Sequence, residues 1–184
     1  MKIKDLRLPL SATPKKADIR YYLNGVNITK DNIIGSDGYR LCRVHTYNND
    51  IPEGHENIIV PVETIKALLK KVGAKHDSME VTIFLNNGRY ELTCMNQVEV
   101  FLPIDHKYPD FKKHLDSVKA NDHNVNLNKI QHQFNWGYVS EANKAICKYM
   151  GNTTPKNLYS TDQLGYFMPS DDIIYIIMPV RIEL

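Results

Sequence analysis

The sequence predicts an α+β protein in which a helix followed by antiparallel strands is repeated, with the helices on one face of the sheets. Two observations predict this arrangement. A helix expected over residues 61–73 precedes strands over 80–102, and a second helix over 138–150 precedes strands near 158–181. Residues 1–44 resemble a third copy, whose helix would lie before Asp18 and would be short, because prolines interrupt helices.

The first third of the chain reads as short strands joined by turns. Alternating polar and apolar residues predict β structure on both sides of Asn24-Gly25, and again on both sides of Asp37-Gly38. A polar loop follows. The expected strands cover residues 19–24, 26–29, 33–36 and 39–44, and the loop covers residues 47–57.

The helix over 61–73 has clear signals at both ends. Pro61 suits the first helical turn, and Gly73 suits a C-cap. Its apolar residues form one stripe, with Lys70 and Lys71 on the far side. Beyond it, Asn87-Gly88 predicts a tight hairpin turn between two strands, and one more strand follows over 98–102.

The last third contains the second helix and a buried tail. Residues 105–124 are polar and read as irregular, and a strand is expected over 125–134. Gly151-Asn152 ends the helix over 138–150. The tail carries two strands, of which 173–178 is apolar on both faces and therefore expected to be buried.

Composition describes an ordinary globular protein. The chain has 184 residues and 21.2 kDa, is 42% hydrophobic and 24% charged, and has room for one full-sized domain or two small ones. No apolar run approaches the roughly 20 residues that span a bilayer, and no secretory signal opens the chain. Three widely spaced cysteines argue against a disulfide framework or a zinc site. We therefore expect a cytoplasmic protein without membrane contact.

Catalysis finds little support in the residues. The seven histidines have no metal-binding spacing, and no glycine-rich phosphate loop is present. Cys42 or Cys94 could meet a histidine as a nucleophile pair, but buried thiols are commoner. Asp37 reads as a turn residue in Ser36-Asp37-Gly38. We expect neither enzymatic activity nor a metal or cofactor.

Positive charge is clustered although the net charge is only +2. Basic residues concentrate in residues 1–20 and 66–75, whereas residues 31–56 are acidic. This distribution predicts one positive surface rather than a positive molecule. Solvated helix faces without a partner are the alternative interpretation.

Six segments, in order, resemble the bacterial sliding clamp, the β subunit of DNA polymerase III. No single segment is specific, but together they are spread over most of the chain. They are Asp18-Ile19-Arg20-Tyr21-Tyr22-Leu23-Asn24-Gly25-Val26, Ser36-Asp37-Gly38-Tyr39-Arg40-Leu41, Ile59-Val60-Pro61, Lys107-Tyr108-Pro109-Asp110-Phe111-Lys112-Lys113, Phe134-Asn135-Trp136-Gly137-Tyr138 and Ile176-Ile177-Met178-Pro179-Val180-Arg181.

The resemblance implies a shortened form of the clamp. Residues 1–115 are similar to the family's middle domain, residues 116–124 to a linker, and residues 125–184 to the second half of its last domain. The family's first domain and the first half of its third have no counterpart here. The usual head-to-tail dimer closes through those parts, so we expect a different closure.

The resemblance also implies a DNA-facing surface made of basic residues on the helices and near the start of the chain. A clamp needs cations that attract phosphates without reading bases. No aromatic residues interleave these cations, which fits duplex better than single-stranded DNA. The expected residues are Lys66, Lys70, Lys71, Lys75, Lys144, Lys148, Lys15 and Lys16, with ordinary solvent exposure as the alternative.

In the family a hydrophobic pocket captures short peptides from polymerases and the clamp loader. Carried over by position, it consists of Leu23, Ser36, Gly38, Tyr39, Arg40, Leu41, Pro109, Lys113, His114, Asn135, Tyr138, Ile176, Ile177, Met178, Pro179, Val180 and Arg181. A buried last strand would explain Ile176, Ile177 and Met178 equally well. Arg40 and Arg181 need a partner or a ligand if they are buried.

Two hypotheses follow. The first is a minimal processivity factor, of phage or mobile-element type, that encircles duplex DNA. The family's ring holds roughly twelve helix-plus-strands units, so about three per chain imply a homotetramer with head-to-tail contacts. The second is a non-ring decoy or adaptor that binds clamp-binding peptides without encircling DNA. The lysine pattern favours the first hypothesis; the missing half-domain and the prolines of the first helix favour the second.

Overall fold

The computed structural model describes residues 1–47, 49–120, 133–154, 156–161 and 164–180. These residues contain three units, each a helix followed by three strands. Unit 1 is α1 (Ile3–Leu10) with β1 (Gly25–Thr29), β2 (Asn32–Ser36) and β3 (Arg40–His45). Unit 2 is α2 (Val62–Val72) with β5 (Thr82–Asn86), β6 (Arg89–Cys94) and β7 (Gln97–Phe101). Unit 3 is α4 (Trp136–Met150) with β8 (Tyr159–Ser160), β9 (Gly165–Ser170) and β10 (Ile173–Ile177).

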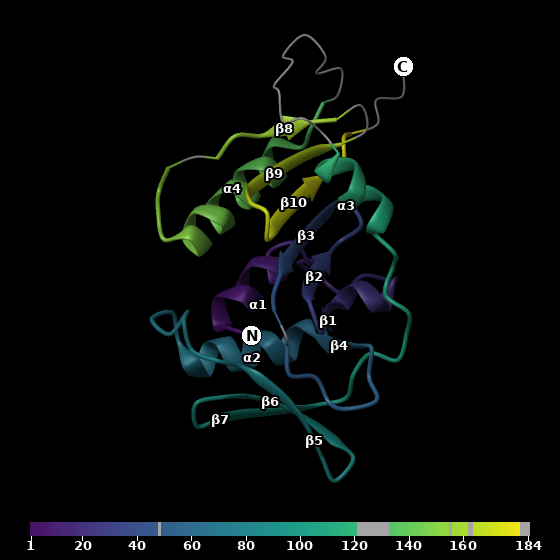
Figure 1. Ribbon diagram of the computed structural model, residues 1–184, viewed down its shortest axis with the longest axis vertical. Coiled ribbons are helices and arrows are strands. Elements are labelled where there is room, and N and C mark those ends of the chain that lie inside the picture. Colours follow the sequence, from purple (N-terminus) through teal and green to yellow (C-terminus); the bar gives the residue numbers. More distant parts are fainter. Residues whose placement is uncertain (48, 121–132, 155, 162–163, 181–184) are drawn as a thin grey trace.

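Two antiparallel sheets hold these units together. The larger has seven strands in the order β4-β1-β2-β3-β10-β9-β8, where β4 (Asn57–Pro61) precedes α2, and the smaller is β5-β6-β7. The larger sheet joins units 1 and 3 through β3 and β10, with Ile173 opposite Val44 and Ile177 opposite Arg40. Figure 1 shows α4, α1 and α2 one above another along one side of the molecule, beside the strands. The predicted α+β fold is confirmed, with the helices of the three units on one side.

The first helix forms despite its prolines. Pro9 lies in the last turn of α1, and Asp5 supports the first turn by accepting a hydrogen bond from the backbone N–H of Lys2 at 2.8 Å. Ile3 and Leu6 are fully buried. α1 packs so closely on β2 that a Cβ on Gly35 would overlap the carbonyl of Pro9. Glycine is therefore the residue that allows this helix to approach the sheet.

The two helices that the sequence predicts most clearly have the expected ends. Gly73 and Gly151 follow α2 and α4 with φ of +80° and +67°. Asn135 caps α4 by accepting hydrogen bonds from the backbone N–H groups of Gly137 and Tyr138. This cap starts α4 two residues before the predicted position.

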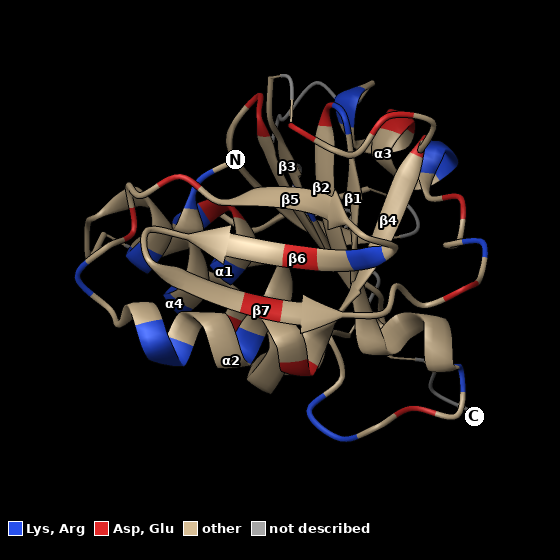
Figure 2. Cartoon of the chain, turned by 90° about the horizontal axis from the view of Figure 1, so that it is seen from below, with Lys and Arg blue, Asp and Glu red and all other residues tan. Residues whose placement is uncertain are grey.

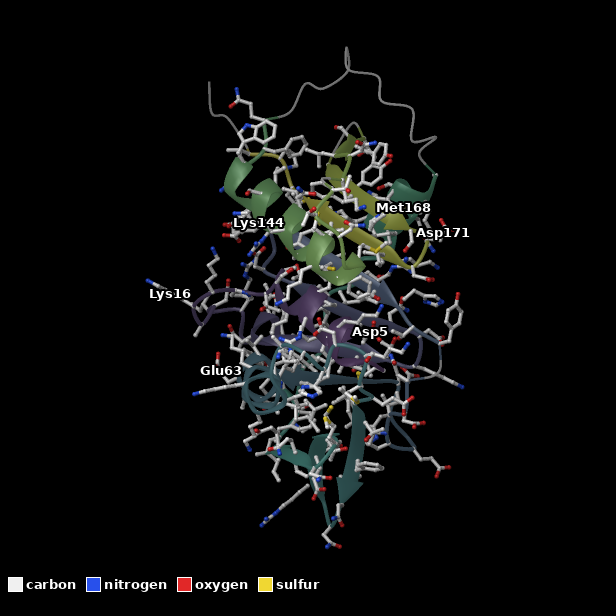
Figure 3. The ribbon with its side chains drawn as sticks, turned by 90° about the vertical axis from the view of Figure 1, so that its left-hand side faces the viewer. Asp5, Lys16, Glu63, Lys144, Met168 and Asp171 are labelled. Atoms are coloured by element: carbon white, nitrogen blue, oxygen red, sulfur yellow. The ribbon has the colours of Figure 1, made fainter. Side chains whose placement is uncertain are left out.

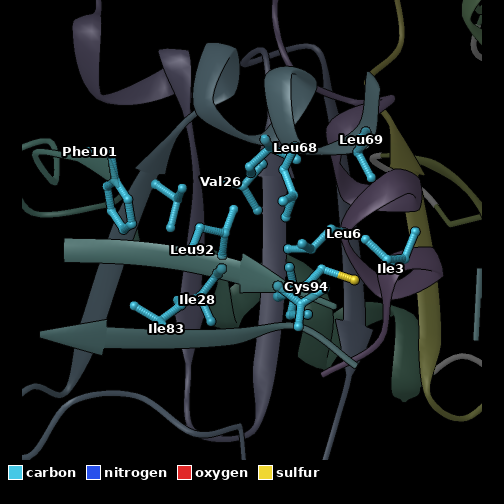
Figure 4. Packing of buried hydrophobic residues seen from close by; sticks show 14 of the residues in the cluster. Ile3, Leu6, Val26, Ile28, Leu68, Leu69, Ile83, Leu92, Cys94 and Phe101 are labelled. Carbon is cyan, nitrogen blue, oxygen red and sulfur yellow. The ribbon is translucent and has the colours of Figure 1, made fainter. Parts of the chain in front are cut away.

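The core is divided between the units. α2 packs on β6 and β7, and a cluster including Leu68, Leu92 and Phe101 fills the space between α2, the small sheet and the strands β1, β2 and β4 (Figure 4). A second cluster, including Leu8, Ala142 and Tyr175, packs α1 and α4 on β3 and β10. Each helix thus buries its apolar stripe against a sheet, which is the main source of its stability.

The prediction that residues 105–124 are irregular is wrong in part, because α3 (Lys112–Lys119) lies there. Val118 is fully buried and packs with Leu41, Tyr166 and Ile176. These residues alternate along β3, β9 and β10 with those that face α1 and α4, so α3 covers the opposite face of the sheet. Its mostly polar sequence hides the helix, because one turn of apolar contacts is enough to dock it.

Other differences are local. Residues 21–24 form a 3₁₀ turn, η1 (Tyr21–Asn24), instead of a strand. The Asn24 side chain holds this turn, because its amide oxygen accepts from the backbone N–H of Asp18 and its amide nitrogen donates to the Asp18 carbonyl. The strand predicted near 158–167 divides into β8 and β9. The strand predicted over 125–134 falls almost entirely outside the described residues.

In the described part of the chain, no helix is long and apolar enough to cross a membrane. The same residues contain no group of three or more histidine, cysteine, aspartate or glutamate side chains that could hold a metal ion.

Candidate functional site

A groove of about 690 Å³ opens where units 1 and 3 meet. Three segments that are far apart in the sequence form it: the turn before β3, the start of α4, and the residues that follow β10. It is lined by Gly38, Tyr39, Asn135, Tyr138, Met178, Pro179 and Val180, all of which are among the pocket positions named from the sequence.

Backbone pairing holds the three segments together. The N–H of Met178 donates to the carbonyl of Tyr39 at 2.8 Å, which extends the β3–β10 ladder by one residue. The N–H of Val180 donates to the carbonyl of Gln133 at 2.7 Å, which ties the tail to the segment before α4. Backbone hydrogen bonds at the end of the sheet therefore hold the walls of the groove in place.

The turn at Ser36–Arg40 forms one wall of the groove. The Asp37 carboxylate accepts hydrogen bonds from the backbone N–H groups of Tyr39 and Arg40 at 2.9 and 2.7 Å. Gly38 has a φ of +84°, and a side chain there would overlap the guanidinium of Arg20. Together these contacts leave Tyr39 60% exposed at the rim of the groove.

Arg40 follows this turn as the first residue of β3, and its side chain is only 2% exposed. It contacts Asp37 Oδ2 at 2.8 Å and Glu141 Oε2 at 2.8 Å, and its guanidinium stacks 4.3 Å from the centre of the Tyr138 ring. Protein groups therefore meet its need for a partner without a ligand. Arg40 fixes the position of Tyr138, which lines the groove.

Glu141 completes this network and was not identified from the sequence. The hydrogen bond from Lys15, together with the nearby Arg40, holds the pKa of the Glu141 carboxyl below its ordinary value. Glu141 lies 101 positions from Arg40 and on another unit. No local sequence signal connects two such residues.

The lining can receive apolar side chains at an aqueous surface. Met178, Pro179, Val180 and the Tyr138 ring offer apolar area, while Asn135 and the backbone at Gly38 add polar groups. Trp136, next to Asn135 in the chain, is 73% exposed. Exposed aromatic and aliphatic side chains beside a groove are typical of protein-binding surfaces.

The remaining predicted pocket residues do not line the groove. Leu23, Ser36, Leu41, Ile176 and Ile177 are buried. For Ile176 and Ile177 this fits the alternative of a buried last strand. Pro109 and His114 are half-buried, and Lys113 is exposed on α3. Met178 is half-buried and lines the groove, which makes it both a strand neighbour and a surface residue. Arg181 lies outside the described residues.

An ion pair braces the turn from outside. Arg20 donates from Nε and a terminal nitrogen to the two Asp18 oxygens at 3.0 and 2.9 Å, and donates to the Asp37 carbonyl at 3.1 Å. The side-chain and backbone hydrogen bonds from Arg20 lower the pKa of Asp18 from 3.8 to about 2. The Asp-x-Arg spacing is visible in the sequence, but the contact with Asp37 is not.

This pKa predicts an acid-sensitive fold. A carboxyl whose pKa is lowered by folding contributes stability above its ordinary pKa, and that contribution is lost as the pH falls through the lowered value. We expect Asp18→Asn to reduce the free energy of unfolding at neutral pH, with the difference from wild type disappearing from about pH 5 to about pH 2. Urea unfolding at several pH values measures this. Asp105→Asn, at an exposed position, is the control; a difference that persists unchanged at pH 2 would contradict the assignment.

The predicted basic residues lie mainly on the helical side. Figure 3 shows Lys16 and Lys144 projecting on the side opposite Met168 and Asp171. Lys16, Lys70, Lys75, Lys144 and Lys148 are exposed and make no ion pair with any residue that the structure describes. The other three pair with acids: Lys66 with Glu63 at 2.8 Å, Lys71 with Glu99 at 2.7 Å, and Lys15 with Glu141.

A depression of about 360 Å³ lies between α1, α2 and α4. Lys4, Arg7 and Lys148 lie on its border. Arg7 pairs with Asp77 at 2.7 Å, and Lys4 stacks 4.7 Å from the centre of the Tyr149 ring. Figure 2 shows basic residues along the helices, together with an acidic residue on α2, and acidic residues on β6 and β7, with Arg89 at the start of β6. The helical side is therefore a broad positive surface interrupted by few acids.

Comparison with known proteins connects these features to one class. No model of a known protein family matches the sequence. The chain is 25% identical over 132 residues to the beta sliding clamp of Chlamydia muridarum, covering 68% of this chain and 35% of that protein. It is 25% identical over 114 residues to the beta sliding clamp of Chlamydia trachomatis, covering 60% and 27%. The chain thus spans about a third of the length of these relatives.

Solved structures agree. The DNA polymerase sliding clamp of Bacillus subtilis superimposes with a TM-score of 0.65 at 16% identity, covering 98% of this chain and 62% of that one. DNA polymerase III subunit beta of Borrelia burgdorferi, in complex with a natural product, gives 0.66 at 16% identity, covering 100% and 64%. These comparisons confirm the resemblance inferred from the sequence and the fold that it implies.

Proposed function

We propose that this chain, which has the fold of the bacterial sliding clamps, is a reduced, non-enzymatic clamp for DNA replication. It assembles as a homo-oligomeric ring, favoured as a tetramer, around duplex DNA, and binds peptides of a polymerase or clamp loader in the groove. The observation that carries the proposal is the groove itself. Three separate segments of the chain line it, and their lining residues are among those that the resemblance names.

The groove suits a short peptide with apolar side chains. Backbone hydrogen bonds already hold its walls in place. On binding, the peptide would therefore lose conformational freedom, whereas the groove would not. Met178 and Val180 offer the anchoring surface, and Tyr39 stands at the rim. The buried Arg40 network beneath Tyr138 makes this surface rigid.

The helical side suits a sequence-independent polyanion. Its unpaired lysines are flexible point charges that attract phosphates without the fixed geometry that base recognition requires. In a ring this surface would line the central hole. Duplex binding through phosphates releases counterions and is therefore strongly salt-dependent.

Together, the peptide groove and the positive helical side would tether a polymerase to DNA. A polymerase bound at the groove would remain near the primer end while the ring slides, which raises its effective concentration there. We assign residues 1–115 to a clamp domain, 116–124 to a linker and 125–184 to a half-domain. The protein would act in the cytoplasm of a bacterial cell, or of an infected cell if a phage carries it.

The native mass tests this proposal. Light scattering on a sizing column, across a concentration series, is expected to give four times 21.2 kDa. A concentration-independent monomer would favour the decoy or adaptor without a ring. One argument for that alternative was the prolines of the first helix, and α1 forms in spite of them.

A further inference from the structure

Units 1 and 3 are joined in a defined way within the chain. Each contributes the last of its three strands, β3 and β10, and these two strands pair antiparallel over five residues. The helices of the two units also meet across the joint, where Tyr149 donates a hydrogen bond to Asp5 at 2.9 Å. The chain therefore contains one example of how two units connect: last strand to last strand, with the helices side by side.

Unit 2 presents the equivalent strand, β7, without a neighbour among the described residues. β7 pairs with β6 on one side only, at the end of the small sheet. The free edges of β5 and β4, by contrast, are partly covered by other parts of the chain. The N–H of Val81, just before β5, donates to the carbonyl of Met1, and the N–H of Ile104 donates to the carbonyl of Ile59 in β4.

The outer face of the edge strand β7 is apolar and exposed. Val98 and Val100 point to the outer face and are 46% and 58% exposed, and Leu102 beyond them is 77% exposed. Phe84 of β5 lies in the same row as Val100. Free edge strands usually carry lysine, proline, a bulge or an inward-pointing charge that prevents pairing. Gln97–Phe101 contains no lysine, proline or bulge, and its one charged residue, Glu99, is paired with Lys71.

We infer that β7 pairs antiparallel with β7 of a second copy of this chain, across a two-fold axis. Identical strands can pair antiparallel only around such an axis, which makes the contact isologous. The charge of Glu99 disfavours one register, and the row of exposed apolar residues favours another. A register centred on Glu99 would oppose two carboxylates, whereas one centred on Val100 places Val98 opposite Leu102 and keeps Glu99 with Lys71 on the inner face.

This joint deepens the proposed function and rests on its homo-oligomer part, but not on DNA or peptide binding. It would place α2 beside α2 of the second copy, as α1 lies beside α4, and so continue the positive helical side. It also replaces the head-to-tail contact expected from the sequence with a two-fold contact. A closed tetramer then needs a second two-fold joint elsewhere, as in dihedral assemblies.

A single cysteine on the axis tests the inference. Val100→Cys is made in the full chain with Cys147→Ser, because Cys42 and Cys94 are buried. Directly opposed residues on paired strands are close enough for a disulfide, so mild oxidation should yield a covalent dimer on a denaturing gel. Phe84→Cys in the same background is the matched control, since it lies on the same face but two strands from the axis. We expect at least about tenfold less dimer from it.

A second variant separates this inference from the proposed ring. Val100→Glu opposes two carboxylates at an exposed position, and should halve the native mass without lowering the melting temperature. A full native mass with neither cross-linking nor any effect of Val100→Glu would overturn the β7 joint and leave the ring standing. Cross-linking with a native dimer as the largest species would support the joint and overturn the ring. A monomer that does not cross-link would overturn both.

Discussion

Replacing Met178 with glutamate is expected to weaken peptide binding by about 30-fold or more, the effect of losing an interface anchor worth about 2 kcal/mol. Met178 lines the groove and is held against Tyr39 by a backbone hydrogen bond. A carboxylate there would have to be desolvated whenever an apolar side chain enters. The backbone of β10 is unaffected, so the fold and the native mass should remain unchanged.

Fluorescence anisotropy measures this effect with overlapping peptides that tile the replicative polymerase of the cell in which the chain occurs. Met95→Glu is the matched control, because Met95 is exposed in the turn between β6 and β7, far from the groove. Leu41 would not serve as a test, since its side chain is buried and a charge there would disrupt the sheet. Full peptide affinity in Met178→Glu would show that the groove is not the binding site.

Neutralising Lys70, Lys71, Lys144 and Lys148 together is expected to lower duplex DNA affinity by about a hundredfold to a thousandfold near 0.1 M salt. Each lysine that neutralises a phosphate contributes about 0.9 to the slope of log K against log salt, so the slope should fall by about 3. The pairing of Lys71 with Glu99 reduces its share. The residues are exposed, and folding should not change.

Binding to a labelled duplex at several salt concentrations measures both quantities. The matched control changes four lysines on other surfaces and has the same net charge: Lys30, Lys107, Lys112 and Lys119. Two of these lie on α3, across the sheet from α1 and α4. If both quadruple variants lose the same affinity, binding depends on total charge and the helical side is not the DNA surface.

Local signals made much of the fold predictable from the sequence. Pro61 and Gly73 frame α2, Gly151 ends α4, and Asn87-Gly88 turns the β5–β6 hairpin with φ of +48° and +75°. These residues act through backbone conformations that neighbours a few positions away do not change. Seven residues of the groove were also named in advance, by resemblance of short motifs rather than by physical derivation.

The sequence by itself thus determined the repeated units, their helix ends and the basic character of the helices. Only the tertiary structure decided that α3 docks through Val118, that Pro9 rests on Gly35, and that Arg40 is neutralised by Glu141. The reason is physical. Turns and caps depend on the conformational preferences of a few adjacent residues, whereas docking and charge pairing depend on contacts between elements distant in sequence. The pairing of β3 with β10, for example, brings together residues more than a hundred positions apart.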